Sequence, residues 1–141
     1  MIGDMGGFCA AAYKRGISFV NLPTTLLSQV DASVGGKLGI DFNGFKNHIG
    51  FFQEPNRVII APGFLTTLPD RDLRSGFAEV IKHCLIADTD YWSMITKQDY
   101  VKQDWQKIIP RSVSTKYKVV TEDPTEQGLR KILNFGHTIG H

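Results

Sequence analysis

Short apolar runs and helix-like segments alternate in the first half of the chain. Residues 16–22 and 58–60 are apolar runs bounded by glycine, proline or polar residues, and they predict two short buried strands. Residues 6–13, rich in small side chains, and residues 26–30 predict helices. A succession of helix, strand, helix and strand indicates part of an α/β layer.

After Pro69 the apolar spacing becomes that of a helix. From Leu73 onward, apolar residues recur at intervals that place them on one helical face, namely at Phe77, Val80, Ile81, Cys84 and Leu85. We therefore expect two units, with residues 1–68 in an α/β domain and residues 69–141 in an all-α domain.

Two more helices are predicted in the second unit. Residues 90–97 have the length of a short helix. Pro110 suits the first turn of another helix, because a helix leaves the N–H groups of its first turn unpaired in any case. The pair Asp123-Pro124 marks the end of that helix, and Gly128 lies in the loop before the last one.

Composition excludes several classes of protein. The chain has 141 residues, 42% of them hydrophobic, which is enough for one ordinary core. Its net charge is +2, and its lysines and arginines are scattered, so nothing favours nucleic acid. No apolar run approaches the ~20 residues of a membrane span, and no signal-peptide pattern is present. Cys9 and Cys84 match no metal-binding spacing, so we expect reduced core cysteines in a cytoplasmic protein.

The helix around Glu79 has a polar face opposite its apolar one. At ~100° per residue, Glu79 and Lys82 point away from Val80 and Cys84. Taken alone, this pattern is typical of a solvated face that carries an ion pair at i and i+3. The alternative is that Glu79 binds a metal and Lys82 binds an anion beside it.

Two histidines, His137 and His141, lie four residues apart near the end of the sequence. Residues at i and i+4 share a helical face, and imidazole is a common ligand of zinc-like metals. The spacing suggests a metal enzyme, but local hydrogen bonding of the two rings explains it equally well. The HExxH glutamate is absent.

Glycine-rich segments in the first half predict turns. Residues 35–41 and the pair Asn43-Gly44 are the clearest examples. Gly35-Gly36-Lys37 could present N–H groups and an ammonium to a phosphate, although a plain surface turn is the simpler interpretation. Lys116 and Arg130 are cations in apolar surroundings whose ends would ordinarily reach solvent.

Five sequence blocks follow one another along the chain: Ile2-Gly3-Asp4 with Gly7-Phe8, residues 22–37, Lys46-Asn47, residues 75–82 and residues 130–141. Several long blocks in order are more specific than any single motif. Taken together, these blocks resemble the 3-dehydroquinate synthase family of the shikimate pathway. The resemblance spans nearly the whole chain and implies the central portion of a longer enzyme, truncated at both ends.

The resemblance implies an NAD-binding, Rossmann-like α/β domain followed by an all-α helical domain, with the active site between them. Glu79 and His137 then match two of the three ligands of a divalent metal, zinc or cobalt. The third ligand would lie beyond residue 141. His141 matches a histidine of the substrate shell rather than a ligand, in contrast to the spacing argument.

Further positions receive roles from the resemblance alone. Those that match groups holding the carboxylate, hydroxyls and phosphate of the substrate are Lys37, Asn47, Lys82, Lys116, Arg130 and Asn134, with Asp31 in the same catalytic neighbourhood. Those that resemble NAD contacts are Gly3, Asp4, Thr24, Thr25, Lys37, Lys46, Phe64, Leu65, Thr66 and Thr67.

The implied reaction converts 3-deoxy-D-arabino-heptulosonate 7-phosphate into 3-dehydroquinate and phosphate. It uses NAD catalytically and a divalent metal that polarises substrate oxygens. The partner is a small sugar phosphate, and neither nucleic acid nor a membrane is implied. The intact enzyme is expected to be a cytoplasmic homodimer.

Three other interpretations compete with this one. A metal-dependent polyol or glycerol-type dehydrogenase would share the two-domain plan but would not need so many cations for anionic groups. A different sugar-phosphate cyclase would make another carbocycle. A third possibility is that the 141 residues alone are inactive and form only a binding or packing module, with weak affinity for NAD and metal.

Overall fold

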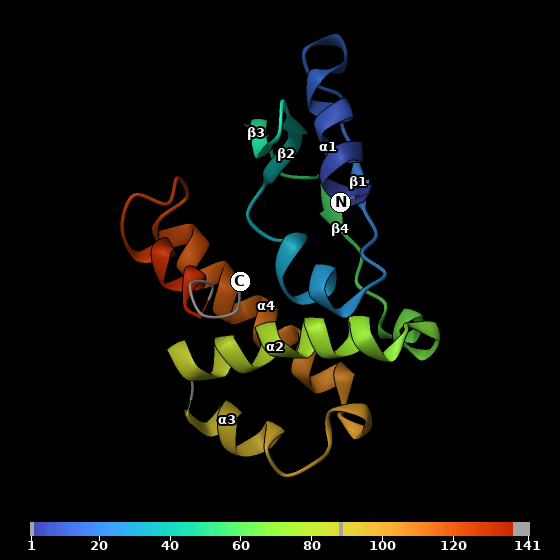
Figure 1. Cartoon of the computed structure of the whole chain (residues 1–141), viewed down its shortest axis with the longest axis vertical. Helices are drawn as coiled ribbons and strands as arrows, with labels where there is room; N and C mark the ends of the chain where they lie inside the picture. The colour runs from blue at the N-terminus through green and yellow to red at the C-terminus, as the bar shows by residue number, and fades with distance from the viewer. Residues whose placement is uncertain (1, 88, 137–141) are drawn as a thin grey trace.

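The structure, a computed structural model, describes residues 2–87 and 89–136. Figure 1 shows α1 and two small sheets in the upper part of the molecule and the longer helices α2 and α4 in the lower part. The predicted residues His137 and His141 lie outside the described residues. None of the described helices is long and apolar enough to cross a membrane.

The upper part consists of one helix and two pairs of strands. Helix α1 (Ile2–Ala12) packs against an antiparallel hairpin. At this contact the ring centroids of Phe8, in the helix, and Phe51, in the hairpin, lie 5.1 Å apart. The hairpin consists of β2 (Lys37–Phe42) and β3 (Phe45–Phe52). The other pair is parallel and very short, with β1 (Val20–Asn21) beside β4 (Arg57–Val58).

Two predictions for this part need correction. The expected buried strands at 16–22 and 58–60 shrink to two residues each, and the side chain of Val20 is 54% exposed. The expected turn over 35–41 is mostly strand, because β2 begins at Lys37 and pairs with β3. The turn at Asn43-Gly44 is confirmed: both residues have positive φ, 51° and 82°, as a tight two-residue hairpin turn requires.

The lower part is helical. Helix α2 (Asp70–Ala87) confirms the predicted periodicity, and α3 (Thr89–Ile95) confirms the short helix expected after it. Helix α4 (Trp105–Glu122) begins five residues before Pro110, so the prediction of a first-turn proline is wrong. The other helical elements of the described residues are short: η1 (Tyr13–Arg15), η2 (Ser28–Ala32, a π-helix), η3 (Pro62–Thr67), η4 (Tyr100–Lys102) and η5 (Leu129–Asn134).

The early start of α4 follows from packing. Ile108 and Ile109 are each 1% exposed and need a helical backbone to reach the core that α2 and α3 line. Burial of two such side chains stabilises the fold by about 3–6 kcal/mol. This gain outweighs the one helical hydrogen bond that proline removes, although Pro110 in a helix interior costs about 3 kcal/mol.

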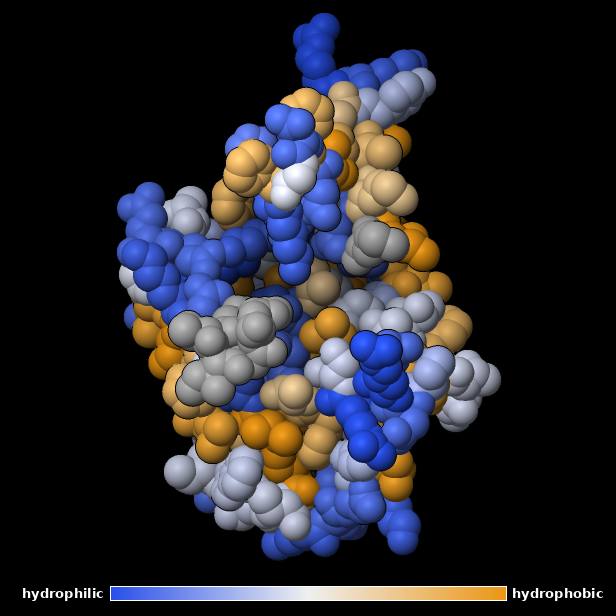
Figure 2. Space-filling view, viewed as in Figure 1, coloured by the Kyte–Doolittle hydropathy of each residue, from blue (hydrophilic) through white to orange (hydrophobic). Residues whose placement is uncertain are grey.

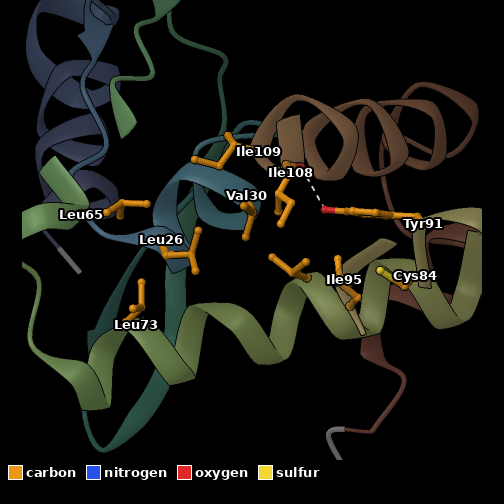
Figure 3. Packing of buried hydrophobic residues seen from close by; sticks show 10 residues of the cluster. Leu26, Val30, Leu65, Leu73, Cys84, Tyr91, Ile95, Ile108 and Ile109 are labelled. Atoms are coloured by element: carbon orange, nitrogen blue, oxygen red, sulfur yellow. Dashed lines mark hydrogen bonds between the residues drawn. The ribbon is translucent and has the colours of Figure 1, made fainter. Parts of the chain in front are cut away.

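The hydrophobic core lies between α2, α3, α4 and the segment around η2 (Figure 3). Its members are Leu26, Val30, Leu65, Leu73, Val80, Cys84, Tyr91, Ile95, Ile108 and Ile109. The hydroxyl of Tyr91 donates to the carbonyl of Ile108 at 2.9 Å and lies 2.7 Å from Ser112 Oγ. The core position predicted for Cys84 is confirmed, but Cys9 is exposed.

Large apolar side chains remain uncovered on the upper part of the molecule. Figure 2 shows them as orange patches over α1 and the hairpin. They include Ile2 at 80% exposure, Phe45 at 62% and Phe52 at 65%. Contiguous apolar surface of this kind ordinarily marks a contact with other protein surface.

Helix α2 lies very close, at Gly76, to the backbone just before η2. A Cβ atom on this residue would lie 2.5 Å from the backbone nitrogen of Leu27 and 2.6 Å from Cβ of Leu26. Both neighbours are fixed, since Leu26 is fully buried and Leu27 supplies backbone. The absent side chain at Gly76 therefore sets the distance between α2 and η2.

We predict that Gly76→Ala destabilises the fold by about 1–3 kcal/mol, because the added methyl group forces backbone apart in a packed core. The matched control is Gly6→Ala in α1, where a Cβ would meet nothing within 4 Å. This control should be neutral or up to about 1 kcal/mol stabilising. Urea denaturation of the three chains measures both effects, and equal midpoints for Gly76→Ala and the parent would contradict the close approach.

Candidate functional site

The polar face of α2 is buried, which overturns the interpretation of a solvated face. The side chains of Glu79 and Lys82 retain only 16% and 8% of their exposure, and their predicted i,i+3 ion pair is formed. Helix α2 packs against η2 and η5 as well as against α3 and α4, so its second face is covered too. A charged helical face is buried only where the charges find partners.

A second buried ion pair faces this one. Lys116 of α4 lies with Nζ 2.8 Å from Oδ1 of Asp31 in η2, and it also donates to the backbone carbonyl of Asp31. Burial lowers the pKa of the Lys116 ammonium, although the negative charge of Asp31 acts to raise it. Burial, the largest single influence, acts to raise the pKa of Asp31, but Lys116 together with Lys82 and His83 holds that pKa below its ordinary value. The contact ties η2 to α4.

A histidine that the sequence reasoning missed completes this neighbourhood. His83 is fully buried, and neither ring nitrogen has a hydrogen-bond partner among the described residues. Burial lowers the pKa of His83 to about 4, so its imidazole is neutral at pH 7. The signal was available, because His83 follows Glu79 by four residues and so shares its helical face.

Three possible metal ligands converge here. One ligand atom from each of Asp31, Glu79 and His83 lies within 4.8 Å of the other two. Two carboxylates and a neutral imidazole are a donor set that suits zinc-like divalent cations. Glu79, one of the two ligands that the resemblance implies, therefore lies among donors that suit a divalent metal, and the other implied ligand, His137, lies outside the described residues.

Further cations, some buried and one exposed, gather around the same group. Arg130 is 3% exposed and donates from Nη2 to the carbonyl of Gly35 at 3.1 Å, so the expectation that Arg130 and Lys116 reach solvent is wrong. Lys37, which is exposed, contacts the carboxylate of Glu126. Its pKa is lowered first by burial and then by the charges of Arg130 and Lys116. Several positive groups in one place suit a phosphate or carboxylate.

The loop before η5 holds Arg130 in position. The carboxylate of Asp123 accepts backbone N–H groups from Gln127 at 3.0 Å, Gly128 at 2.7 Å and Arg130 at 3.0 Å. These hydrogen bonds keep the pKa of Asp123 below its ordinary value. Asn134 donates from its side-chain amide to Glu126 at 2.9 Å, which brings it beside the partner of Lys37.

The predicted substrate residue Asn47 lies elsewhere. It sits on β3 with a positive φ of 51°, and its backbone N–H donates to Asp41 at 2.8 Å. Asn47 and its neighbour Lys46 are exposed. Among the described residues, no hydrogen bond or ion pair joins either of them to the buried charges.

Two of the segments predicted to contact NAD lie side by side. The amide of Gln29, fully buried, donates to the carbonyl of Pro23 at 3.2 Å and to that of Ala61 at 3.1 Å. It thereby joins the loop of Thr24 and Thr25, which follows β1, to the chain that leads into Phe64-Leu65-Thr66-Thr67 of η3. The carboxyl ends of parallel strands are where α/β sheets bind nucleotides.

The other positions predicted to contact NAD lie in different surroundings. Leu65 belongs to the core, so its side chain faces away from solvent. Gly3 and Asp4 lie in the first turn of α1, and a Cβ on Gly3 would be 3.8 Å from Oδ1 of Asn21 in β1. Gly3 is therefore close to the end of the parallel pair.

Two family models match consecutive parts of the chain. The model described as 3-dehydroquinate synthase N-terminal covers residues 1–75, and the model described as 3-dehydroquinate synthase C-terminal covers residues 76–141. Curated relatives agree with them. The 3-dehydroquinate synthases of Sulfurimonas denitrificans and Saccharophagus degradans are 49% and 51% identical over 142 and 146 residues. Each match covers 100% of this chain but only 41% and 40% of the relative, respectively.

Solved structures of two related enzymes share the fold. A 2-epi-5-epi-valiolone synthase from Streptomyces hygroscopicus, with NAD+ and Zn2+ bound, gives a TM-score of 0.85 at 30% identity over 95% of this chain and 39% of its own. A 2-deoxy-scyllo-inosose synthase, complexed with carbaglucose-6-phosphate, NAD+ and Co2+, gives 0.79 at 26% identity over 96% and 38%. These likenesses confirm the predicted fold class, part of an α/β layer followed by helices, as in the sugar-phosphate cyclases.

We predict that Lys116→Met destabilises the chain by roughly 3 kcal/mol, because it leaves the Asp31 carboxylate buried without its partner. The double variant Asp31→Asn with Lys116→Met removes both charges and should recover much of this loss. Chemical denaturation of the parent, the two single variants and the double variant gives the coupling free energy. Strictly additive losses would show that the pair contributes nothing.

The stability of the fold should depend on pH through the carboxylate of Asp123. Since its pKa is lowered in the folded chain, its stabilising contribution is complete above its ordinary value of 3.8 and is lost as pH falls through the folded value. The thermal midpoint should therefore fall less between pH 7 and pH 3 in Asp123→Asn than in the parent, with a lower midpoint at pH 7. Glu122→Gln, at the exposed neighbouring carboxylate, should keep the parental slope, and identical slopes in all three would refute the assignment.

Proposed function

The chain belongs to the 3-dehydroquinate synthase family, and we propose that it contributes the central part of an enzyme that converts 3-deoxy-D-arabino-heptulosonate 7-phosphate into 3-dehydroquinate and phosphate. The chain spans about 40% of the length of its curated relatives, so we assign the activity to the complete enzyme. The 141 residues alone are proposed to be inactive. The observation that carries the proposal is the burial of carboxylates, an imidazole and several cations in one place.

In this proposal Glu79 and His137 hold a divalent metal, zinc or cobalt. The donor set around Glu79 supports this role. Such a metal polarises oxygens of a bound substrate. The chain's own contribution is to place a carboxylate with limited exposure beside buried cations, where electrostatic interactions are stronger than in water.

The cations are proposed to bind the anionic ends of the substrate. Lys82, Lys116 and Arg130 are all buried, and each is oriented by a hydrogen bond or an ion pair. A dianionic phosphate and a carboxylate would compete with the protein carboxylates for them. The remaining proposed substrate groups are Asp31, Lys37, Asn47, Asn134 and His141.

NAD is proposed to bind at the carboxyl ends of β1 and β4. The bridge through Gln29 supports this, because it joins two of the predicted segments. NAD supplies reversible hydride transfer, and the protein orients it. The proposed contacts are Gly3, Asp4, Thr24, Thr25, Lys37, Lys46, Phe64, Leu65, Thr66 and Thr67.

We also propose how the intact enzyme is divided into domains and subunits. We place the domain division between residues 68 and 69, immediately before α2 begins. The intact enzyme is proposed to be a cytoplasmic homodimer, and the exposed apolar side chains of the hairpin support an association of this kind. Neither nucleic acid nor a membrane has a part in it.

Two alternative functions would require a different substrate site. A polyol dehydrogenase does not need buried cations for phosphate, so Lys116 and Arg130 favour a phosphorylated substrate. A cyclase that makes another carbocycle is favoured less than 3-dehydroquinate synthase, because identity to curated members of that enzyme is 49–51% and identity to the two other cyclases is 26–30%.

A chimera tests the function. The 141 residues replace the matched segment of the Sulfurimonas denitrificans enzyme, which supplies the remaining parts of the fold. With NAD, zinc and the heptulosonate phosphate, the chimera should release inorganic phosphate. Glu79→Gln in the same chimera should lose at least about 100-fold in kcat, since removal of an outer-shell partner alone costs 10–100-fold.

The products formed by the chimera distinguish a synthase from a dehydrogenase. Phosphate release without accumulation of NADH supports the synthase. Net NADH with a polyol would establish the dehydrogenase instead. A chimera with a native circular dichroism spectrum but no phosphate release would contradict the proposal.

A further inference from the structure

His83 of α2 lies inside the group of buried charges without a hydrogen bond of its own. Its side chain is 0% exposed, and neither ring nitrogen has a hydrogen-bond partner among the described residues. Buried polar groups of native proteins are nearly always hydrogen-bonded, so an unpartnered buried ring calls for an explanation.

Two ion pairs lie beside the ring. Glu79 pairs with Lys82 on α2 itself, and Asp31 of η2 pairs with Lys116 of α4. A ring nitrogen of His83 lies within 4.8 Å of a carboxylate oxygen of Asp31 and of one of Glu79. After burial, which lowers the pKa of His83, the charge of Asp31 has the largest influence on it. Asp31 is therefore the charged group to which the ring is most strongly coupled.

A neutral imidazole can do what neither kind of charged group beside it can do. An ammonium only donates hydrogen bonds and an ionised carboxylate only accepts them, whereas a neutral imidazole has one N–H donor and one acceptor nitrogen. His83 can therefore take the place of a lysine as the donor to a carboxylate. It adds no charge when it does so.

Lys116 has two competing partners once an anion is bound. In the structure its ammonium contacts both the carboxylate and the backbone carbonyl of Asp31. The proposed function gives the same ammonium an anionic end of the substrate to bind. Asp31 would then lose its donor, and a carboxylate with little access to water is unstable without one.

We propose that His83 is a positioning residue, which donates its ring N–H to the Asp31 carboxylate when a bound anion draws Lys116 away. The inference rests on the proposed function for the anion, and it gives a role to a residue to which the resemblance assigns none. Because an N–H···O hydrogen bond spans about 2.9 Å, a side-chain movement of about 2 Å closes the present separation. Asp31 then keeps its place, and Lys116 is available to the substrate.

Steady-state kinetics of the chimera test this role. His83→Leu removes the donor and should raise KM for the heptulosonate phosphate at least about five-fold with kcat within about two-fold, because the hydrogen bond stabilises bound substrate and transition state alike. His83→Asn and His83→Gln each restore a side-chain N–H, and at least one of them should return KM to about the parental value. An unchanged KM in His83→Leu, or no recovery in either amide variant, would overturn the inference.

The matched control is Leu73→Ala, which removes apolar contacts of α2 in the core. This variant should lower the urea midpoint without changing KM. A purely structural role of His83 would make His83→Leu behave in the same way.

A second measurement, on the 141-residue chain, does not depend on the reaction. Lys116→Met removes the ammonium and imitates its withdrawal, so the ring should become the donor to Asp31. His83→Leu should then raise the unfolding equilibrium constant at least about ten-fold more in the Lys116→Met background than in the parent, as urea denaturation of the four chains measures.

Equal effects of His83→Leu in the two backgrounds would overturn the inference. A Lys116→Met chain that failed to fold would also contradict it, because the ring would not have replaced the ammonium. If the parent chimera released no phosphate, the proposed function would fail, and the denaturation experiment would still decide the role of His83.

Discussion

The contact between Lys116 and Asp31 holds together the part of the molecule in which the buried charges gather. It joins α4 to η2 across a distance of 85 residues in the sequence. Because both groups are largely buried, each needs the other to offset the loss of hydration. The two elements that it joins both pack against α2, on which Lys82 and His83 are buried and Glu79 is half-buried. A polar interior of this kind is costly unless its groups are paired, as Glu79 is with Lys82 and Asp31 with Lys116.

Helix α2 is buried on two sides with opposite character. Val80 and Cys84 face the apolar core, together with Tyr91 and the two isoleucines of α4 (Figure 3). Glu79 and Lys82 face the charged cluster. Burial on the apolar side stabilises the fold, whereas burial of charged groups on the other side costs free energy that only their mutual pairing offsets. One rigid helix thus positions the reactive groups against a well-packed support.

The described part of the fold also explains how distant segments serve one site. The short pair β1 and β4 contributes little stability by itself, but it aligns the loops that Gln29 then joins. The hairpin lies in the upper part of the molecule with α1 packed against it, and several of its aromatic rings are exposed (Figures 1 and 2). Relatives of the chain are more than twice as long, and the likeness extends over this whole chain.

The sequence by itself determined the local features whose causes lie within a few residues. The 3.6-residue period predicted α2, Asn43-Gly44 predicted the hairpin turn, and the long blocks in order identified the family. It could not predict that Lys116 and Arg130 are buried, because each is covered by segments far away along the chain. It missed His83, since a lone histidine in an apolar helix is usually a core residue. Pro110 entered the interior of α4 only because Ile108 and Ile109 had a core to fill. Helical period and turn chemistry are local, whereas burial and the convergence of ligands arise only when remote segments meet.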